Sequence, residues 1–554
     1  MSMNTGGRGS GGRPAGSKGK AGANRAGANR AGQGRSGARK HDDRSQQGQG
    51  GGSPHPRGSR GNRSGGAVST QQKQQGGQPP RGQRFGRDES QAKQGGGGET
   101  RRNAKGHERN RKAVKDRAFS ASAPSQRART ADGARAVAFQ VLAAVALEDA
   151  YANLVLPKAI RAAHLDARDA GFATELTYGT LRNQGTYDAI LAHCVDRPVE
   201  KIGTKILLVL RLGVHQLLAM RVPDHAALNQ TVALARAEIG SGPANFVNAV
   251  LRRVSERTPE DWYALIAEEA PDELTRLALE KSHPAWVVRS FRQALAAHGR
   301  KPDEVEALLD ADNASPVVNL VVLPGLGDLD EARAAGAEDG PLVEGSAFYS
   351  AGDLARLESV REGVVRAQDV GSQLVARALA DAPLEGSDSN WLDLCAGPGG
   401  KAALLGALGA QRGARLLANE AADHRAELVR RSLAPLPSGT YSVVAGDGRQ
   451  IARTVAGGSN LPEGMPADVR FDRVMVDVPC SGLGALRRRP EARWRKSPRD
   501  IAELLPLQLD LFKAAASVTR PGGLIAYVTC SPHTAETQSI VHDILRKVDV
   551  TLLD

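Results

Sequence analysis

Apolar residues recur at helical spacing through a long stretch of the chain. Between Ala136 and Leu147 they return every three or four positions, and Lys205–Met220 is apolar on most sides. Ala226–Ile239 and Asn245–Val254 continue the spacing, and no strand pattern interrupts it. Because this spacing gathers apolar side chains on one helix face, it predicts an all-α domain over residues 129–256.

The pattern is mixed over residues 257–365. Helical spacing continues at first, and Ser315–Gly325 then has the pattern of a strand that ends at Pro-Gly. A short helix is expected at Asp328–Ala335, and an apolar stretch follows at Ala347–Tyr349. This order predicts a helical linker and a small α+β subdomain.

Short apolar runs alternate with helical segments over residues 366–554. Such alternation predicts an α/β fold, a doubly wound Rossmann-like sheet that binds ligands at the carboxyl ends of its strands. The strands that we expect are Trp391–Cys395, Ala414–Asn419, Tyr441–Ala445, Arg473–Val476 and Leu524–Thr529.

Residues 1–128 differ in composition from the rest of the chain. They are rich in Gly, Arg, Gln and Ser, and they hold 27 Lys and Arg against 7 Asp and Glu, a net charge of +20. The whole chain carries +13, so the remainder carries −7. Such a segment cannot bury enough apolar surface to fold, and we expect a disordered basic tail. Its charge favours non-specific binding to RNA phosphates, and a solubilising extension without a partner is the alternative.

The chain has four cysteines, and none of them forms a close CxxC pair. This spacing argues against a metal site, and so few thiols suit a reducing compartment better than a disulfide framework. The N-terminus lacks the apolar segment of a signal peptide, and no run of about 18 apolar residues could span a bilayer. We therefore expect a cytoplasmic protein that binds neither membrane nor metal.

A glycine-rich turn follows the first expected strand of the α/β part, in the sequence DLCAGPGGK. Gly397, Gly399 and Gly400 allow a tight turn and close approach of a ligand to the backbone. Glu420 ends the next strand about 20 residues later, where a carboxylate can bind ribose hydroxyls. Asp447 and Asp477 end the third and fourth strands. The first two features alone would also fit a Rossmann oxidoreductase.

Two cysteines follow the last two strands that we expect. Cys480 comes after Asp477 and Cys530 comes after Thr529, so neighbouring strands would bring both thiols to the cofactor pocket. This pairing suits methylation of cytosine at C5, because a thiolate that adds to C6 makes C5 nucleophilic. Asp477 could donate a proton or hydrogen bond at N3, and the second thiol could assist release. The residues alone do not decide which cysteine is the nucleophile.

The motifs DLCAGPGGK, DVPCSGLG and TCSPHTAE resemble those of the Fmu/Sun family of 16S ribosomal RNA cytosine-5 methyltransferases. The segment NFVNAVLRRV resembles the family's NusB-like RNA-binding domain. The resemblance covers roughly residues 131–554 and implies S-adenosyl-L-methionine as the cofactor and 16S rRNA as the substrate. We expect the protein to be a monomer. A transfer RNA substrate, or a non-catalytic RNA-binding assembly factor, are the alternatives.

The resemblance also implies roles for single residues. Cys530 would be the nucleophile, Cys480 would help to release the product, and Asp477 would be the acid at N3. The chain ends at Asp554, just after a further strand that we expect at Val550–Leu553. The family continues beyond this point into a last β-hairpin, which implies a truncated chain. The implied cofactor contacts are Cys395, Ala396, Gly397, Pro398, Gly399, Gly400, Lys401, Glu420, Asp447 and Asp477.

A basic segment lies shortly after Cys480. We expect its cations to hold RNA phosphates and its tryptophan to stack on a base, and a solvated loop is the alternative. These residues are Arg487, Arg488, Arg489, Arg493, Trp494, Arg495, Lys496 and Arg499.

Overall fold

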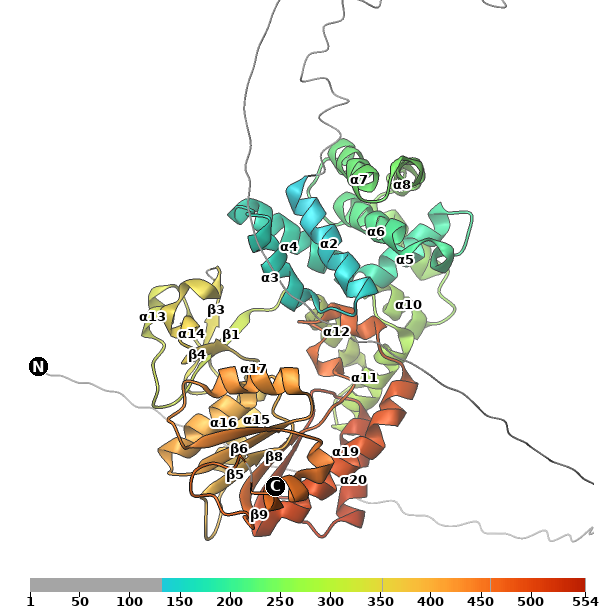
Figure 1. Ribbon diagram of the computed structural model, residues 1–554. Coiled ribbons are helices and arrows are strands. Elements are labelled where there is room, and N and C mark those ends of the chain that lie inside the picture. The colour runs from blue at the N-terminus through green and yellow to red at the C-terminus, as the bar shows by residue number, and fades with distance from the viewer. Residues whose placement is uncertain (1–131, 351, 459, 554) are drawn as a thin grey trace, which may run out of the picture. The chain divides into compact units, whose positions relative to one another are not determined.

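The computed structural model describes residues 132–350, 352–458 and 460–553, and the expected basic tail at residues 1–128 lies outside this part. Within the described part, no helix is both long and apolar enough to cross a lipid bilayer. Helices come first along the chain, a small sheet follows, and a larger sheet comes last (Figure 1).

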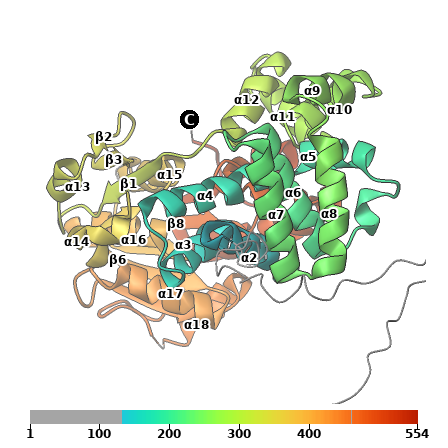
Figure 2. The same ribbon diagram turned by 90° about the horizontal axis from the view of Figure 1, so that it is seen from above.

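The all-α domain predicted from the apolar spacing is confirmed. Its central helix is apolar on most sides because Leu208, Val209, Leu210 and Leu212 are all buried. The last three of its helices lie side by side (Figure 2). The helices are α2 (Gly133–Leu147), α3 (Ala152–Ala162), α4 (Ala167–Arg182), α5 (Gln184–Cys194), α6 (Thr204–Leu218), α7 (Asp224–Glu238) and α8 (Ser241–Val254).

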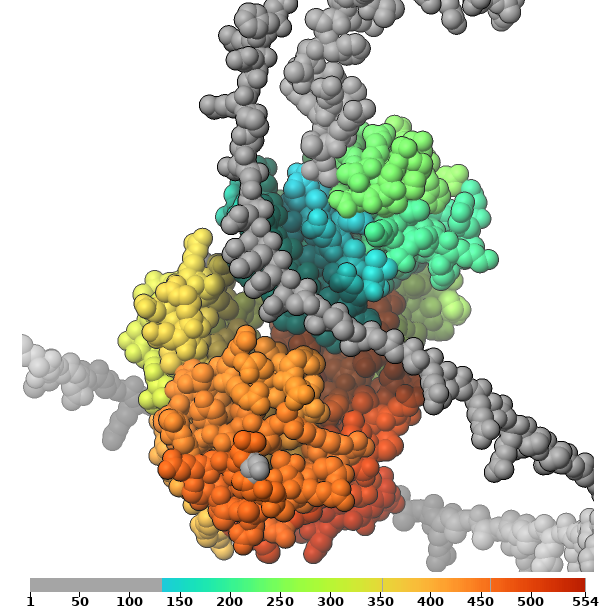
Figure 3. Space-filling model, viewed as in Figure 1, coloured from blue at the N-terminus to red at the C-terminus, as the bar shows by residue number. Residues whose placement is uncertain are grey.

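Four longer helices come next, and a small antiparallel sheet with two short helices follows. The sheet has the order β2-β3-β1-β4, and β4 spans the expected boundary between residues 365 and 366. In the space-filling view the yellow residues of the small sheet form a lobe beside the orange residues of the larger sheet's domain (Figure 3). The elements are α9 (Pro259–Glu268), α10 (Glu273–Glu280), α11 (Ala285–Ala297), α12 (Val305–Asn313), β1 (Val318–Val322), α13 (Asp330–Ala334), β2 (Glu338–Asp339), β3 (Ser346–Tyr349), α14 (Glu358–Arg361) and β4 (Val365–Ala367).

The larger sheet is parallel throughout and has the order β7-β6-β5-β8-β9, which confirms the Rossmann-like fold. The chain runs outward from β5 in one direction through β6 and β7, and in the other through β8 and β9. Its elements are α15 (Val370–Asp381), β5 (Asn390–Asp393), α16 (Gly400–Gln411), β6 (Arg415–Glu420), α17 (Asp423–Leu433), β7 (Tyr441–Ala445), α18 (Ile451–Ala456), β8 (Phe471–Asp477), α19 (Pro498–Val518), β9 (Thr519–Val528) and α20 (Gln538–Lys547).

Both faces of this sheet are covered by helices. Trp391 and Met475 pack with α15, α16 and α17, whereas Leu392 and Val474 pack with α18 and α19 on the opposite face. Neighbouring residues of a strand point to opposite faces, so a strand covered on both sides must be apolar at nearly every position. This burial explains the short continuous apolar runs of the sequence.

The strand expected at Val550–Leu553 is not formed. Val550–Leu553 has the composition of a strand, but these residues form neither helix nor strand. Leu552 and Leu553 are exposed, and β9, the nearest edge of the sheet, pairs with β8 alone among the described strands. A strand exists only where a second strand satisfies its backbone groups, and apolar composition does not supply that partner.

Candidate active site

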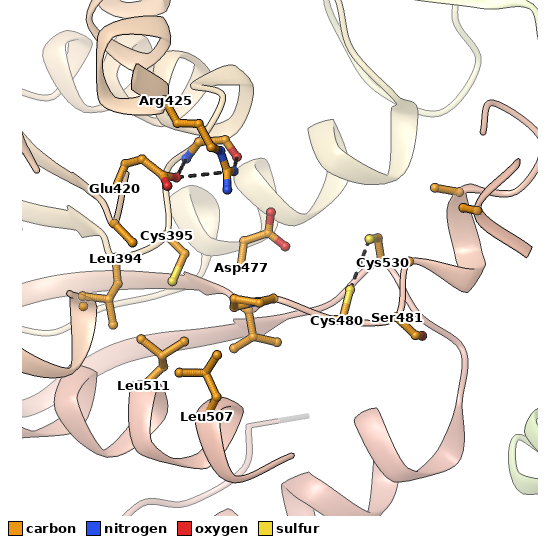
Figure 4. A pocket seen from close by; sticks show the side chains of 18 of the residues that line it. Leu394, Cys395, Glu420, Arg425, Asp477, Cys480, Ser481, Leu507, Leu511 and Cys530 are labelled. Carbon is orange, nitrogen blue, oxygen red and sulfur yellow. Dashed lines mark hydrogen bonds and ion pairs between the residues drawn. The ribbon is translucent and has the colours of Figure 1, made fainter. Parts of the chain in front are cut away.

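The carboxyl ends of β5, β6, β7, β8 and β9 meet at one pocket. The strand order reverses direction between β5 and β8, where open α/β sheets bind their ligands. The cavity holds about 640 Å³, and Figure 4 shows its carboxylates and sulfurs along one wall. It is lined by Asp149, Tyr151, Leu394, Cys395, Gly397, Asn419, Glu420, Ala421, Arg425, Asp447, Gly448, Asp477, Val478, Pro479, Cys480, Ser481, Gly482, Ala485, Arg489, Ala492, Arg495, Lys496, Leu507, Leu511 and Cys530.

The glycine-rich turn joins β5 to α16. A side chain at Gly397 would place its Cβ 2.1 Å from Glu420 Oε2, so the backbone must be bare where it meets that carboxylate. Gly399 caps α16 at φ +110, and a Cβ there would lie 2.5 Å from Ser432 Cβ on α17. Gly397 therefore faces the pocket, whereas Gly399 allows the turn to pack against α17.

Glu420 is buried at the carboxyl end of β6. Its Oε2 accepts a hydrogen bond from Gly397 N at 3.1 Å, and its Oε1 accepts one from Ala422 N at 3.2 Å. Arg425 lies 3.4 Å from Oε2 and also donates to Gly397 O (Figure 4). Each carboxylate oxygen has a second lone pair that can accept a further hydrogen bond from a ligand.

Asp447 follows β7, as the sequence predicts, and caps the short 3₁₀ helix η5 (Gly448–Gln450). Its carboxylate accepts hydrogen bonds from Arg449, which lower its pKa. Asp447 is thus an anion on the pocket wall.

Asp477 ends β8 and accepts a hydrogen bond from Lys401 Nζ at 2.8 Å. Asp393, which the sequence analysis did not single out, is fully buried at the end of β5. Burial, with the nearby Asp477 charge, raises the pKa of Asp393 to about 7. Asp393 could have been noticed from the sequence, because it ends a strand directly before the glycine-rich turn.

The sulfurs of Cys480 and Cys530 lie 3.3 Å apart (Figure 4). Pairing of Asp477 with Val528 aligns the two strand ends, and Gly484 N donates to Cys530 O at 2.8 Å. A Cβ at Gly484 would lie 2.8 Å from that carbonyl oxygen, so only glycine allows this approach. The expectation that both thiols reach the pocket is met in the geometry.

The two thiols share a proton unequally. The hydrogen bond from Cys530 lowers the pKa of Cys480 to about 7, although burial opposes this shift. The same hydrogen bond, with burial, raises the pKa of Cys530 above its ordinary value. In the free protein Cys480 is therefore the thiol that ionises first.

A buried polar network lies behind the two cysteines, and the sequence analysis missed it. Glu536 accepts hydrogen bonds from Ser481 N at 2.8 Å and from Ser481 Oγ at 2.5 Å. Gln508 Nε2 donates both to Glu536 Oε1 and to Pro479 O, and Ser481 Oγ lies 3.0 Å from Ser531 Oγ. Glu536 thereby joins the loop after β8 to the loop after β9.

The basic segment after Cys480 is used mainly within the protein, so the expected RNA role is wrong for Arg493. Its guanidinium is fully buried and donates to Arg182 O, Ser282 O and Asn313 Oδ1. Arg487 donates to Ser315 O, and Arg488 lies 3.5 Å from Asp369. Backbone carbonyl oxygens at element ends need donors, and Arg487 and Arg493 supply them.

Trp494 packs against the helical domain rather than presenting a free face. A Cβ at Gly185 would lie 2.4 Å from its ring, and the Trp494 side chain is only partly exposed. Arg495 donates to three carbonyl oxygens near the end of α2. The local sequence gave no signal for these partners, because they lie over 300 residues away.

The pocket brings together part of the predicted set. Cys395, Gly397, Glu420, Asp447, Asp477, Cys480 and Cys530 line it. Ala396, Pro398, Gly399, Gly400 and Lys401 are not among the lining residues. Lys401 still reaches the site through its bond to Asp477.

Comparison with known proteins adds two family matches. Residues 378–554 match the family described as 16S rRNA methyltransferase RsmB/F, and residues 132–256 match the NusB family. A provisionally named methyltransferase of Mycobacterium tuberculosis is 46% identical over 430 residues, which cover 77% of this chain and 90% of that protein.

A relative and a solved structure extend the comparison. The ribosomal RNA small subunit methyltransferase B of Pseudomonas putida is 31% identical over 74% of this chain and 89% of its own. The crystal structure of PH0851 has a TM-score of 0.63 at 19% identity, covers 76% of this chain and 90% of its own, and supports the fold. The relatives from Mycobacterium tuberculosis and Pseudomonas putida both match this chain across most of their length. The chain therefore belongs to the RsmB/F family of 16S rRNA methyltransferases.

Proposed function

We propose that the chain is an S-adenosyl-L-methionine-dependent methyltransferase that modifies C5 of a cytosine in 16S rRNA. The observation that carries the proposal is the contact of two sulfurs, 3.3 Å apart, beside Asp477 in a pocket with further carboxylates. Cytosine-5 chemistry uses one thiol to add to C6 and can use a second during release. The name of the Pseudomonas putida relative supports ribosomal RNA as the substrate.

The residues of the pocket fit S-adenosyl-L-methionine, which would supply a methyl group on a positively charged sulfur. Glu420 Oε1 has a free lone pair for a ribose hydroxyl, and Asp447, whose carboxylate is bonded to Arg449, would lie at the adenosyl end. Leu394, Leu507 and Leu511 offer apolar contacts for the adenine ring. The proposed cofactor contacts are the predicted residues that line the pocket, namely Cys395, Gly397, Glu420, Asp447 and Asp477.

Cys530 Sγ adds to C6 of the base in the first step. Its proton passes to the Cys480 sulfur to which it is hydrogen-bonded, and the S–C6 bond forms as the C5–C6 double bond opens. Negative charge develops toward N3, where the Lys401 ammonium, which also donates to Asp477, supplies a hydrogen-bond donor. Bound S-adenosyl-L-methionine would supply the methyl group to C5, which would leave the modified base without net charge.

Release needs a base for the proton at C5. Cys480, which holds the proton that it took from Cys530, first loses that proton to solvent. Its thiolate then takes the C5 proton, the double bond reforms, and Cys530 leaves as a thiolate. Transfer of that proton from Cys480 to Cys530 restores the starting state, so one proton is released in each turnover.

The test combines single substitutions with mapping of the product. Cys530→Ser is expected to abolish methyl transfer. Cys480→Ser, in which Cys530 must lose its proton to solvent instead, is expected to form slowly and then trap a covalent RNA–protein adduct that survives denaturing electrophoresis. Cys194→Ala is the matched control, because Cys194 is buried in the helical domain. Bisulfite mapping of ribosomal and transfer RNA, with and without the protein, identifies the base.

Each alternative has its own outcome. If Cys530→Ser retains transfer and Cys480→Ser loses it without an adduct, the two roles are reversed. A new 5-methylcytosine in transfer RNA alone would contradict the ribosomal substrate. Absence of transfer to any RNA by the wild-type chain would contradict the enzymatic proposal.

A further inference from the structure

The reaction pocket has a second wall, which comes from the helical domain. Asp149 and Tyr151, in the turn between α2 and α3, line the same cavity as Cys480 and Cys530. More than 300 residues separate the turn from these cysteines in the sequence. The turn is therefore positioned by tertiary contacts, and those contacts are specific.

The catalytic domain holds this turn through the 3₁₀ helix η7 (Pro490–Trp494) and the residue after it. Arg495 donates to Val145 O at 2.7 Å, Asp149 O at 3.1 Å and Ala150 O at 2.6 Å. The buried Glu491 accepts a hydrogen bond from Ala152 N at 3.0 Å. Arg495 thus donates to carbonyl oxygens at the end of α2 and in the turn, and Glu491 accepts from the start of α3. Together these hydrogen bonds fix the position of the turn.

Tyr151 lies close to two arginines at the pocket wall. The guanidinium carbon of Arg489 lies 4.6 Å from the ring centroid, and that of Arg495 lies 5.1 Å away. The tyrosine is 36% exposed, so part of the side chain remains accessible to a ligand. Arginine–aromatic stacks of this kind can extend to a nucleobase, because guanidinium and aromatic planes both stack on bases.

Two cations beside Tyr151 are available for a ligand. Arg489 and Lys496 line the cavity, and neither has an ion-pair partner within 4.0 Å among the residues that the structure describes. Neighbouring cations differ in this respect, since Arg488 lies near Asp369 and Arg499 pairs with Glu503. The Asp149 carboxylate on the same wall would keep a phosphate on the side of Arg489 and Lys496.

We propose that Tyr151, Arg489 and Lys496 form a subsite for the nucleotide next to the reacting cytosine, with the base at Tyr151 and the phosphate at the two cations. This inference rests on the proposed function, because a strand whose cytosine enters the pocket must also pass its mouth. The helical domain then takes part in substrate recognition at the reaction site itself.

The test measures binding of a short single-stranded RNA with one cytosine to the full chain carrying Cys530→Ser, by fluorescence anisotropy. Tyr151→Ala should weaken binding about tenfold, as expected for loss of one base stack, and Tyr151→Phe should retain it. Arg489→Ala should reduce the salt dependence of binding by about one phosphate contact. Arg546→Ala on exposed α20 removes the same charge away from the pocket and should leave binding unchanged.

A second strand, with an abasic nucleotide beside the cytosine, identifies the partner of Tyr151. The missing base should weaken binding to the Cys530→Ser protein but cause no further loss with Tyr151→Ala. If the abasic nucleotide weakens RNA binding equally with and without Tyr151→Ala, the subsite proposal is wrong. It is also wrong if Tyr151→Ala and Arg489→Ala bind RNA as the parent does while keeping the parent's melting temperature. Because this readout needs no methyl transfer, failure of the proposed function is recognised separately, by bisulfite mapping of the wild-type product.

Discussion

At the scale of single residues, the proton shared between the sulfurs of Cys480 and Cys530 decides which thiol is ionised. Cys480 ionises first in the free protein, although the family resemblance assigns the nucleophile to Cys530. The proposed cycle uses both facts, since Cys480 accepts the proton that Cys530 gives up. Titrations of such a pair belong to the pair as a whole.

This sharing predicts a pH dependence. Below pH about 7 Cys480 holds a proton and cannot accept another, so single-turnover methylation should fall about tenfold for each pH unit below that value. Above it the rate should level off. A rapid-quench series from about pH 5.5 to 9 measures the profile. The control is Asp393→Asn, because the pKa of Asp393 is also raised to about 7. If the inflection in the pH profile disappears in this variant, the inflection belongs to Asp393 and not to Cys480.

The buried Glu536 carboxylate predicts a second effect. Glu536→Gln replaces one acceptor oxygen by an NH₂ group that meets the donors of Ser481, so the two loops should separate. We expect adduct formation to slow by about ten- to a hundredfold while RNA affinity stays the same. Adduct yield against time in the Cys480→Ser background measures this, with exposed Glu427→Gln on α17 as control. An equal loss in the control would refute a positioning role.

Strand ends, at the scale of the element, carry most of what the sequence predicts about this site. Tyr441–Ala445 was predicted with the observed bounds, and the Glu420, Asp447 and Asp477 positions follow from their strands. This works because a strand buried on both faces leaves a continuous apolar run that ends where a polar residue begins. The composition of Val550–Leu553 misled, since pairing requires a partner strand.

The loops after the strands could be predicted less well. The basic segment looked like a phosphate site, but Arg493 and Arg495 bind carbonyl oxygens of the helical domain and its neighbours. The charge of an arginine does not show whether it binds RNA phosphates or carbonyl oxygens within the protein, because it donates hydrogen bonds to both kinds of oxygen. Tyr151 gave no signal, since only the folded chain brings it to the pocket.

Close approach of the two cysteine loops predicts the effect of a single methyl group. Gly484→Ala should force the loops apart, because the new Cβ would lie 2.8 Å from Cys530 O. We expect methyl transfer to fall by at least tenfold, measured by incorporation of labelled methyl groups into RNA. Gly171→Ala on α4 is the matched control, where nothing lies within 4 Å and alanine favours the helix. Full activity of Gly484→Ala would contradict the contact.

Charge is divided unevenly at the scale of the whole molecule. Residues 1–128 carry a net charge of +20, and the remainder carries −7. Removing residues 1–128 should therefore weaken RNA binding more at low salt than at high salt, and it should lower the slope of log affinity against log salt. Filter binding at several salt concentrations tests this. An unchanged slope would contradict a role for the segment in binding RNA.

The buried Arg493 has a consequence for how the molecule comes apart. Its guanidinium satisfies oxygens from α4, from the segment before α11 and from α12, all outside the domain of the larger sheet. If either domain unfolded alone, the Arg493 guanidinium and its acceptor oxygens would lose their hydrogen-bond partners. Each buried group left without a partner would cost roughly 1–3 kcal/mol of free energy. Calorimetry should therefore record one cooperative transition for the wild-type chain, and two for Arg493→Met. On this view the methylating domain and the helical domain form a single folding unit, so neither would serve as an interchangeable module.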